Sequence, residues 1–133
     1  MNKVILITGT SSGIGKDTAL SLIKEGHVVY GAARRLEMMQ DIIHAGGHAV
    51  KMDILKERNI DKVVNQITKE QNRIDILINN AGYGLWGAVE TISIAEAKRQ
   101  FDVNIFGLAY LTKKIIPLMR KQKSGKIINM SSM

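Results

Sequence analysis

Short apolar runs alternate with helix-spaced apolar positions along the whole chain. The runs are rich in β-branched residues and stop at turn residues, as strands do. The predicted strands are Val4–Ile7, Val28–Tyr30, Ala49–Met52, Asp75–Ile78 and Ile127–Met130. Between them, the clearest helical spacing is i, i+3, i+4, i+7, in Ile60, Val63, Val64 and Ile67. Strands that alternate with helices predict a parallel α/β sheet, and continuously apolar strands are expected when helices cover both faces.

The same spacing predicts a helix before and a helix after the second strand, and a long helix before the fifth. The first of them carries Ile14, Thr18, Leu22 and Ile23 and ends at Gly26; the next carries Leu36, Met39, Ile42 and Ile43 and ends at Gly46-Gly47. The long helix begins near Ser93, which forms a capping box with Glu96. Its inner face is predicted to hold Phe101, Ile105, Leu108 and Thr112. Pro117 is expected to kink or shorten it, because proline removes a helical hydrogen bond.

Composition narrows the possible functions. The 133 residues fit one domain, 45% of them are apolar, and no apolar run is long enough to span a bilayer. The net charge of +7 would suit a nucleic-acid binder, but aromatic residues are too few to stack on bases. Without cysteine, disulfides and thiolate metal sites are excluded, and the three histidines are too scattered to hold a metal. We expect a cytoplasmic protein with no membrane span and no nucleic-acid partner.

The loop after the first strand carries the first functional signal. Thr8 is followed by Gly9, Gly13 and Gly15 in the spacing Gly-x-x-x-Gly-x-Gly, and a helix comes next. Glycines permit a tight turn and close approach to a pyrophosphate, while the helix N-terminus offers free N–H groups and a positive dipole end. A loop that merely needs positive φ would show the same residues.

Four other segments extend this signal along the chain. Asp53-Ile54 follows the third strand, Asn79-Asn80-Ala81-Gly82 follows the fourth, Val103-Asn104 lies on the long helix, and Lys126 to Ser132 closes the chain. Together with the loop, they resemble the short-chain dehydrogenase/reductase family. The resemblance implies a Rossmann-like doubly wound parallel sheet with strand order 3-2-1-4-5 and further strands beyond the fifth. Residues 1–133 would then form a single dinucleotide-binding domain, truncated after the fifth strand, without the C-terminal catalytic and substrate portion.

The same resemblance implies an oxidoreductase that interconverts a ketone or aldehyde and an alcohol by hydride transfer. The implied phosphate contacts are Gly9, Ser11, Ser12, Gly13, Ile14 and Gly15, where the serine hydroxyls bind phosphate, cap the helix, or do both. Asp53, with Ile54, is the implied adenine contact. Asn80, Ala81 and Gly82 are expected along the ribose, whereas Asn79 is expected to tie strands together. A non-catalytic nucleotide-binding module remains the alternative function.

For catalysis, the resemblance implies a serine that hydrogen-bonds the substrate oxygen. Ser132 is the first candidate and Ser131 the second. Asn104 is the implied helix asparagine of the catalytic tetrad; alternatively, it only bends the helix. The family's Tyr-x-x-x-Lys pair would follow the serine, beyond Met133, so this chain alone is expected to be inactive.

Tyr110 and Lys114 have the spacing of that pair but precede the serine. Helical geometry predicts that Tyr110 faces solvent or a partner subunit. Together with Lys113 and Lys114, Tyr110 marks the face of the long helix, the fourth in the chain, that a homo-oligomer would use. Tyr83, Leu85 and Trp86 are equally well explained as a substrate-pocket border or as a local apolar cluster.

The end of the second strand indicates which cofactor is bound. Ala32 occupies the position where NAD-binding members carry an acid, and Arg34 and Arg35 follow. Guanidinium groups suit a 2′-phosphate, so NADP(H) is favoured, with NAD(H) as the alternative. Against this, Ser12 stands where many NADP-preferring members carry a basic residue.

Overall fold

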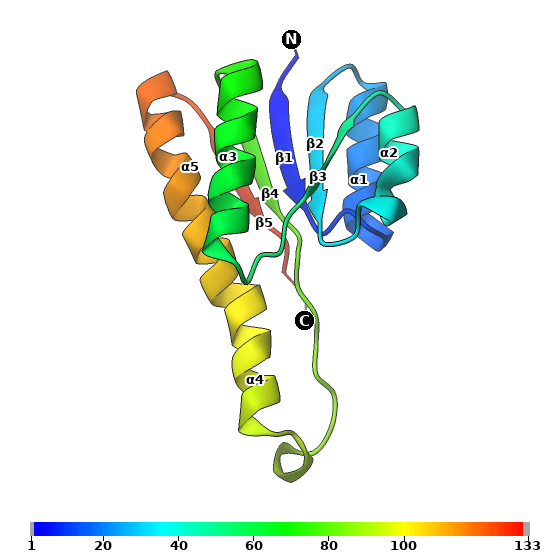
Figure 1. Cartoon of the computed structure of the whole chain (residues 1–133), viewed down its shortest axis with the longest axis vertical. Helices are drawn as coiled ribbons and strands as arrows, with labels where there is room; N and C mark the ends of the chain where they lie inside the picture. Colours follow the sequence, from blue (N-terminus) through cyan, green and yellow to red (C-terminus); the bar gives the residue numbers. More distant parts are fainter. Residues whose placement is uncertain (1, 132–133) are drawn as a thin grey trace.

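The computed structural model describes residues 2–131 as one parallel sheet with helices on both faces. Its strands are β1 (Val4–Thr8), β2 (Val28–Ala33), β3 (His48–Lys51), β4 (Ile76–Asn79) and β5 (Lys126–Asn129). They lie in the order β3-β2-β1-β4-β5, and each neighbouring pair is parallel (Figure 1). The predicted sheet and strand order are therefore confirmed.

Helices cover the two faces in two pairs (Figure 1). One face carries α1 (Gly13–Lys24) and α2 (Gln40–His44), and the other carries α3 (Glu57–Gln71) and α5 (Leu108–Gln122). Strand β1 is buried along its whole length. Its side chains alternate, with Leu6 in the cluster under α3 and α5, and Ile5 and Ile7 in the cluster under α1 and α2. Two covered faces explain why the central strands are continuously apolar.

A carboxylate fixes the start of this sheet. Asp75 is buried and accepts hydrogen bonds from the Val4 N–H, at 2.8 Å, and from the Arg73 guanidinium. Burial raises the pKa of Asp75, but the bonds from Arg73 and Val4 and the charges of Arg73 and Lys3 outweigh burial and hold that pKa below its usual value. This carboxylate is therefore stabilised in its ionised form by folding.

The region between β2 and β3 is less helical than predicted. It contains a 3₁₀ turn, η1 (Leu36–Met39), followed by the single short turn of α2. Met39 and Ile42 are buried as predicted, whereas Leu36 and Ile43 are exposed, and so is Ile14 in the first turn of α1. A short helical segment can present only a narrow face to the sheet, so alternate positions of the predicted stripe face solvent.

The long helix before β5 is continuous but is not α-helical throughout. After the 3₁₀ turn η2 (Val89–Thr91) it runs as α4 (Ile94–Phe101), a π-helical segment η3 (Asp102–Gly107) and α5. The predicted capping box is present: the Ser93 hydroxyl accepts from the Glu96 N–H at 3.1 Å, and the Ser93 N–H donates to the Glu96 carboxylate at 3.3 Å. No helix within residues 2–131 is long and apolar enough to cross a membrane.

The predicted inner face of this helix is wrong in its first half. Phe101 and Ile105 are 53% and 49% exposed, and the buried face of α5 is formed by Leu111, Ile115 and Met119. The π-helical turn shifts the angular phase that a regular helix would keep. In addition, α4 extends beyond the sheet, so its apolar side chains have no layer beneath them (Figure 1).

Pro117 does not shorten the helix, because α5 continues to Gln122. Its side chain is on the exposed face of α5. The carbonyl that loses its helical partner can be hydrated there, and the buried face on the other side holds the helix to the sheet.

Candidate cofactor site

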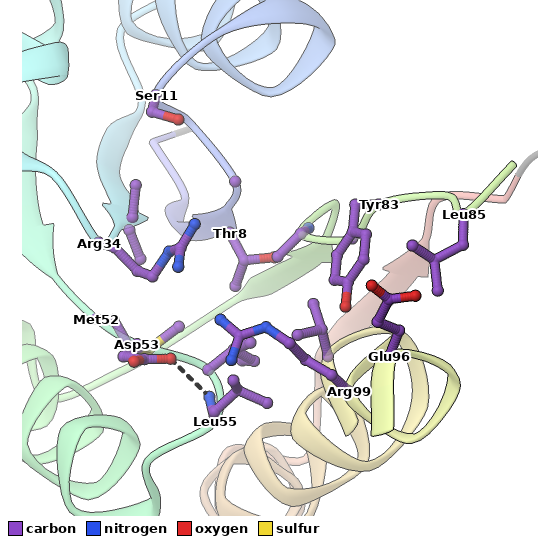
Figure 2. Close-up of a pocket in the computed structure, with 17 residues that line it drawn as sticks. Thr8, Ser11, Arg34, Met52, Asp53, Leu55, Tyr83, Leu85, Glu96 and Arg99 are labelled. Atoms are coloured by element: carbon purple, nitrogen blue, oxygen red, sulfur yellow. Dashed lines mark hydrogen bonds between the residues drawn. The ribbon is translucent and has the colours of Figure 1, made fainter. Parts of the chain in front are cut away.

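A cavity of about 520 Å³ opens at the carboxyl ends of β1, β2 and β4 and against α4 (Figure 2). Strands β2 and β4 flank β1 on opposite sides, so successive strands are added to one edge of the sheet before this point and to the other edge after it. Such a switch point is where open α/β sheets bind ligands. The lining residues are Thr8, Gly9, Ser11, Ala32, Ala33, Arg34, Met52, Asp53, Ile54, Leu55, Ala81, Gly82, Tyr83, Leu85, Glu96, Arg99 and Val103.

The glycines of the loop after β1 serve different purposes. Gly9 and Gly13 adopt positive φ values of 71° and 60°. A Cβ on Gly15 would lie 2.4 Å from both the Asn80 side-chain amide and the Gly9 carbonyl oxygen. A Cβ on Gly13 would meet nothing within 4 Å. The loop is therefore packed tightly against Asn80 on one side and is open on the other, which leaves room for a ligand at the start of α1.

The N-terminus of α1 is not capped by a side chain. Ser12 has an extended backbone, its hydroxyl makes no capping hydrogen bond, and the first turn has no acidic residue. The first N–H groups of a helix have no partner within the helix. This end of α1 therefore presents unsatisfied donors and a positive dipole end, a combination that suits an anion.

One hydroxyl joins the walls of the cavity. Thr8, buried at the end of β1, accepts hydrogen bonds from the Asn80 and Ala81 N–H groups, each at 2.9 Å. The Asn80 side chain donates to the Gly9 carbonyl at 3.2 Å. Of the three residues expected along the ribose, Ala81 and Gly82 line the cavity, while Asn80 braces the glycine loop from behind.

Asn79 ties strands together, as expected. Its side-chain amide donates to the Asn129 side-chain oxygen at 2.9 Å and to the Thr112 hydroxyl at 3.1 Å. This links β4 to β5 and to α5. Met130 follows in register, with its N–H bonded to the Asn79 carbonyl. Ser131 comes next and is exposed, whereas Ser132 lies outside the described residues.

The β2 and β3 side of the cavity holds the residues expected to contact adenosine. Arg34 and Ala32 line it, but Arg35 is exposed and lies outside the lining. One Asp53 carboxylate oxygen accepts from the Leu55 N–H at 3.0 Å, which fixes the turn after β3. Ile54 is buried beside it. A guanidinium and a carboxylate thus face the cavity from neighbouring strand ends.

Asn104 holds the segment that follows β4. Its side chain accepts from the Tyr83 N–H at 3.0 Å and donates to the Tyr83 carbonyl at 2.7 Å. Gln100 adds a bond to the same carbonyl at 3.3 Å. Asn104 belongs to the π-helical segment, which turns its amide toward this backbone. It therefore fixes where Tyr83 enters the cavity.

The expectation that Tyr110 faces solvent is wrong, whereas its contact with a partner subunit stays a prediction. Tyr110 is half-buried against the core cluster under α3 and α5, and its hydroxyl donates to Asp61 on α3 at 2.9 Å. The Lys114 ammonium lies 3.3 Å from the same carboxylate. Desolvation and the hydrogen bond to Asp61 raise the Tyr110 pKa, the opposite of what a tyrosine base needs. Of the proposed partner face, Lys113 and Lys114 remain exposed.

The helix wall of the cavity was found only in part from the sequence, through Val103 beside Asn104, and its two charged residues were missed. Glu96, Arg99 and Val103 line it at i, i+3 and i+7. Their spacing was visible, but a polar stripe on a helix is ordinarily a solvated face. Only the position of Arg99 and Glu96, about one and two turns before Asn104, could have indicated that they face a ligand.

Comparison with known proteins identifies the family. Residues 3–133 match the family model described as short chain dehydrogenase. The chain belongs to the short-chain dehydrogenase family. A 3-ketodihydrosphingosine reductase of Bacteroides thetaiotaomicron is 42% identical to this short-chain dehydrogenase over 130 residues, which cover 98% of the chain and 47% of that relative.

Solved structures agree with this assignment. A short-chain dehydrogenase from Streptomyces avermitilis superposes with a TM-score of 0.96 at 36% identity, covering 99% of this chain and 50% of that one. The closed form of a serine dehydrogenase complexed with NADP+ gives a TM-score of 0.92 at 30% identity, covering 98% of this chain and 54% of that one. This short-chain dehydrogenase thus spans about half the length of the relatives it matches.

Proposed function

We propose that this chain is the NADP(H)-binding portion of an enzyme that interconverts a ketone or aldehyde and an alcohol. The observation that carries the proposal is the cavity at the sheet's switch point, which joins an open glycine loop, an uncapped helix N-terminus and Arg34. Family membership supports the reaction class. The dinucleotide-binding role of residues 1–133 is part of the same proposal.

The residues present fit a nicotinamide dinucleotide. Open space at Gly13 and the free donors of the first turn of α1 suit the pyrophosphate, with Gly9, Ser11, Ser12, Ile14 and Gly15 completing that loop. Asp53 and Ile54, which line the cavity, are proposed to contact adenine, and Ala81 and Gly82 the ribose, with Asn80 behind them. When bound, the cofactor supplies or accepts the hydride.

The preference for NADP(H) rests on the end of β2. The strand ends at Ala33, and Arg34 enters the cavity directly after it. Neither Arg34 nor Arg35 forms an ion pair within residues 2–131, so no carboxylate of this part of the chain competes for Arg34. A guanidinium in this position attracts a 2′-phosphate, whereas a carboxylate would repel it. A related serine dehydrogenase forms a complex with NADP+, which supports the same choice.

The chain's own residues hold and align the reactants. The Asn104 amide fixes the Tyr83 backbone at the cavity wall, and Asn79 holds β5, which leads to Ser131 and Ser132. Ser132 is proposed to donate a hydrogen bond to the substrate oxygen. The proton for that oxygen is assigned to the Tyr-x-x-x-Lys pair that the family places after the serine. The full reaction is therefore proposed for a protein that carries this chain together with that pair.

A calorimetric titration of the 133-residue chain with NADPH and with NADH tests the cofactor proposal. We expect tighter binding of NADPH, and Arg34→Ala should remove most of the difference. Arg58→Ala, an exposed arginine on α3 outside the cavity lining, is the matched control and should keep the difference.

Equal affinity of the wild-type chain for both cofactors would overturn the NADP(H) preference. Binding of neither would overturn the cofactor-site assignment for this chain. A longer protein that carries the Tyr-x-x-x-Lys pair but binds cofactor without any oxidoreductase activity would support a non-catalytic nucleotide-binding module.

A further inference from the structure

Arg99 belongs to the cavity although it comes from α4, far from the glycine loop in sequence. It lines the cavity together with Glu96 and Val103. Figure 2 shows its side chain extending across the opening toward Asp53 and Leu55, while Arg34 approaches from the β2 side. Two guanidinium groups therefore converge on one cavity from different walls.

The Arg99 guanidinium is available to a ligand. Within residues 2–131 it forms no ion pair and no hydrogen bond from its side chain. The two carboxylates of the lining each accept a backbone N–H, Glu96 from Ser93 and Asp53 from Leu55, and neither is paired with Arg99. A guanidinium that has no protein partner but projects into a cavity is placed to contact what fills the cavity.

The surroundings of Arg99 favour a flat aromatic group over a phosphate. Val103, one helical turn further along, lines the cavity as well, and so do the apolar side chains of Ile54 and Leu55 after β3. The loop donors and Arg34, which are suited to phosphate, lie at the ends of β1 and β2 on the other side of the cavity (Figure 2). A guanidinium is planar, delocalised and weakly hydrated, and it stacks on aromatic faces.

We propose that Arg99 stacks on the adenine ring of the bound nucleotide and closes the cavity on its α4 side. This inference rests on the proposed function. The two arginines then have separate roles. Arg34 recognises the 2′-phosphate, whereas Arg99 contributes to the affinity for adenine nucleotides whether or not that phosphate is present.

Two nucleotides that differ only in the 2′-phosphate test this separation of roles. We would titrate the ¹⁵N-labelled chain with 5′-AMP and with 2′,5′-ADP and follow amide shifts, which also report whether each variant is folded. Arg99→Met, which keeps the apolar stem, should weaken the binding of both nucleotides by about the same factor, roughly three- to tenfold. Arg34→Met should weaken only 2′,5′-ADP.

Two further variants separate stacking from charge. Arg99→Lys keeps the charge but loses the plane, so its affinities should resemble those of Arg99→Met. Lys98→Met removes a neighbouring charge that does not line the cavity, and it should leave both affinities unchanged.

Each possible result bears on a different part of the proposal. An Arg99→Met loss confined to 2′,5′-ADP, or wild-type affinity in Arg99→Lys, would overturn stacking and make Arg99 a charge contact. Unchanged binding of both nucleotides in folded Arg99→Met would overturn any role for it. Binding of neither nucleotide to the wild-type chain would instead overturn the proposed function.

Discussion

Replacing Gly15 by alanine should destabilise the chain, although alanine is ordinarily the better helix former. At an open helical position the change would stabilise by up to about 1 kcal/mol. Here the new Cβ would lie 2.4 Å from the Asn80 amide nitrogen and from the Gly9 carbonyl oxygen, where ordinary contact begins at 3.4 Å. Relieving such an overlap costs about 1–3 kcal/mol. Forcing apart the bond between Asn80 and Gly9 costs about 1 kcal/mol more. The net expectation is a loss of about 1–3 kcal/mol.

Urea unfolding followed by circular dichroism measures this loss. With a slope of about 2 kcal/mol/M, the midpoint of Gly15→Ala should fall by about 0.5–1.5 M. Ser21→Ala, on the exposed face of the same helix, is the matched control and should leave the midpoint unchanged or slightly raised. In the background of Asn80→Ala, the Gly15→Ala loss should shrink, because one of the two crowded atoms is gone. A Gly15→Ala midpoint equal to or above the wild-type value would refute the reasoning.

Three other predictions concern the fold around the site. Asp75→Asn should lower the urea midpoint at neutral pH. Folding lowers the pKa of Asp75, so its carboxylate stabilises the fold fully above its unfolded pKa of about 3.9. That stabilisation is lost as the pH falls through the lower folded pKa. The free energy of unfolding should therefore change less with pH in the acid range for the variant than for the wild type. Tyr110→Phe should lower the urea midpoint slightly, through the lost hydrogen bond to Asp61, and should leave nucleotide affinity unchanged; a changed affinity would contradict its structural assignment. Ile115→Ala, at a fully buried position, should lower the free energy of unfolding by about 2–5 kcal/mol, whereas Phe101→Ala, at an exposed one, should lower it far less in the same assay. Comparable losses would mean that Phe101 belongs to the buried face of the helix after all.

The strands could be predicted from the sequence because burial on both faces leaves a continuous apolar run, as in Val4–Ile7. Their order could not be obtained from that pattern, and it came from the family resemblance. The capping box at Ser93 was predictable because its two hydrogen bonds are local. These features depend on neighbours in the chain or on the family motifs.

The predictions that were wrong concern features that depend on tertiary structure. Periodicity assumes a regular helix, and the π-helical segment from Asp102 to Gly107 breaks that assumption, which misplaced Phe101 and Tyr110. Arg99 was missed because its sequence surroundings are those of a solvated helix, and only the position of α4 beside the strand ends brings it to the cavity. The roles of Ser132 and Asn104 in catalysis remain predictions.

The Thr8 hydroxyl has a consequence for how this region tolerates change. It receives two backbone N–H groups from the segment after β4, and that segment holds the glycine loop through Asn80. Two loops more than seventy residues apart in the sequence are therefore held together by one hydrogen-bond network. Substitutions in the two loops are expected to combine non-additively, so an engineered change to the glycine loop should be made together with changes in the segment after β4.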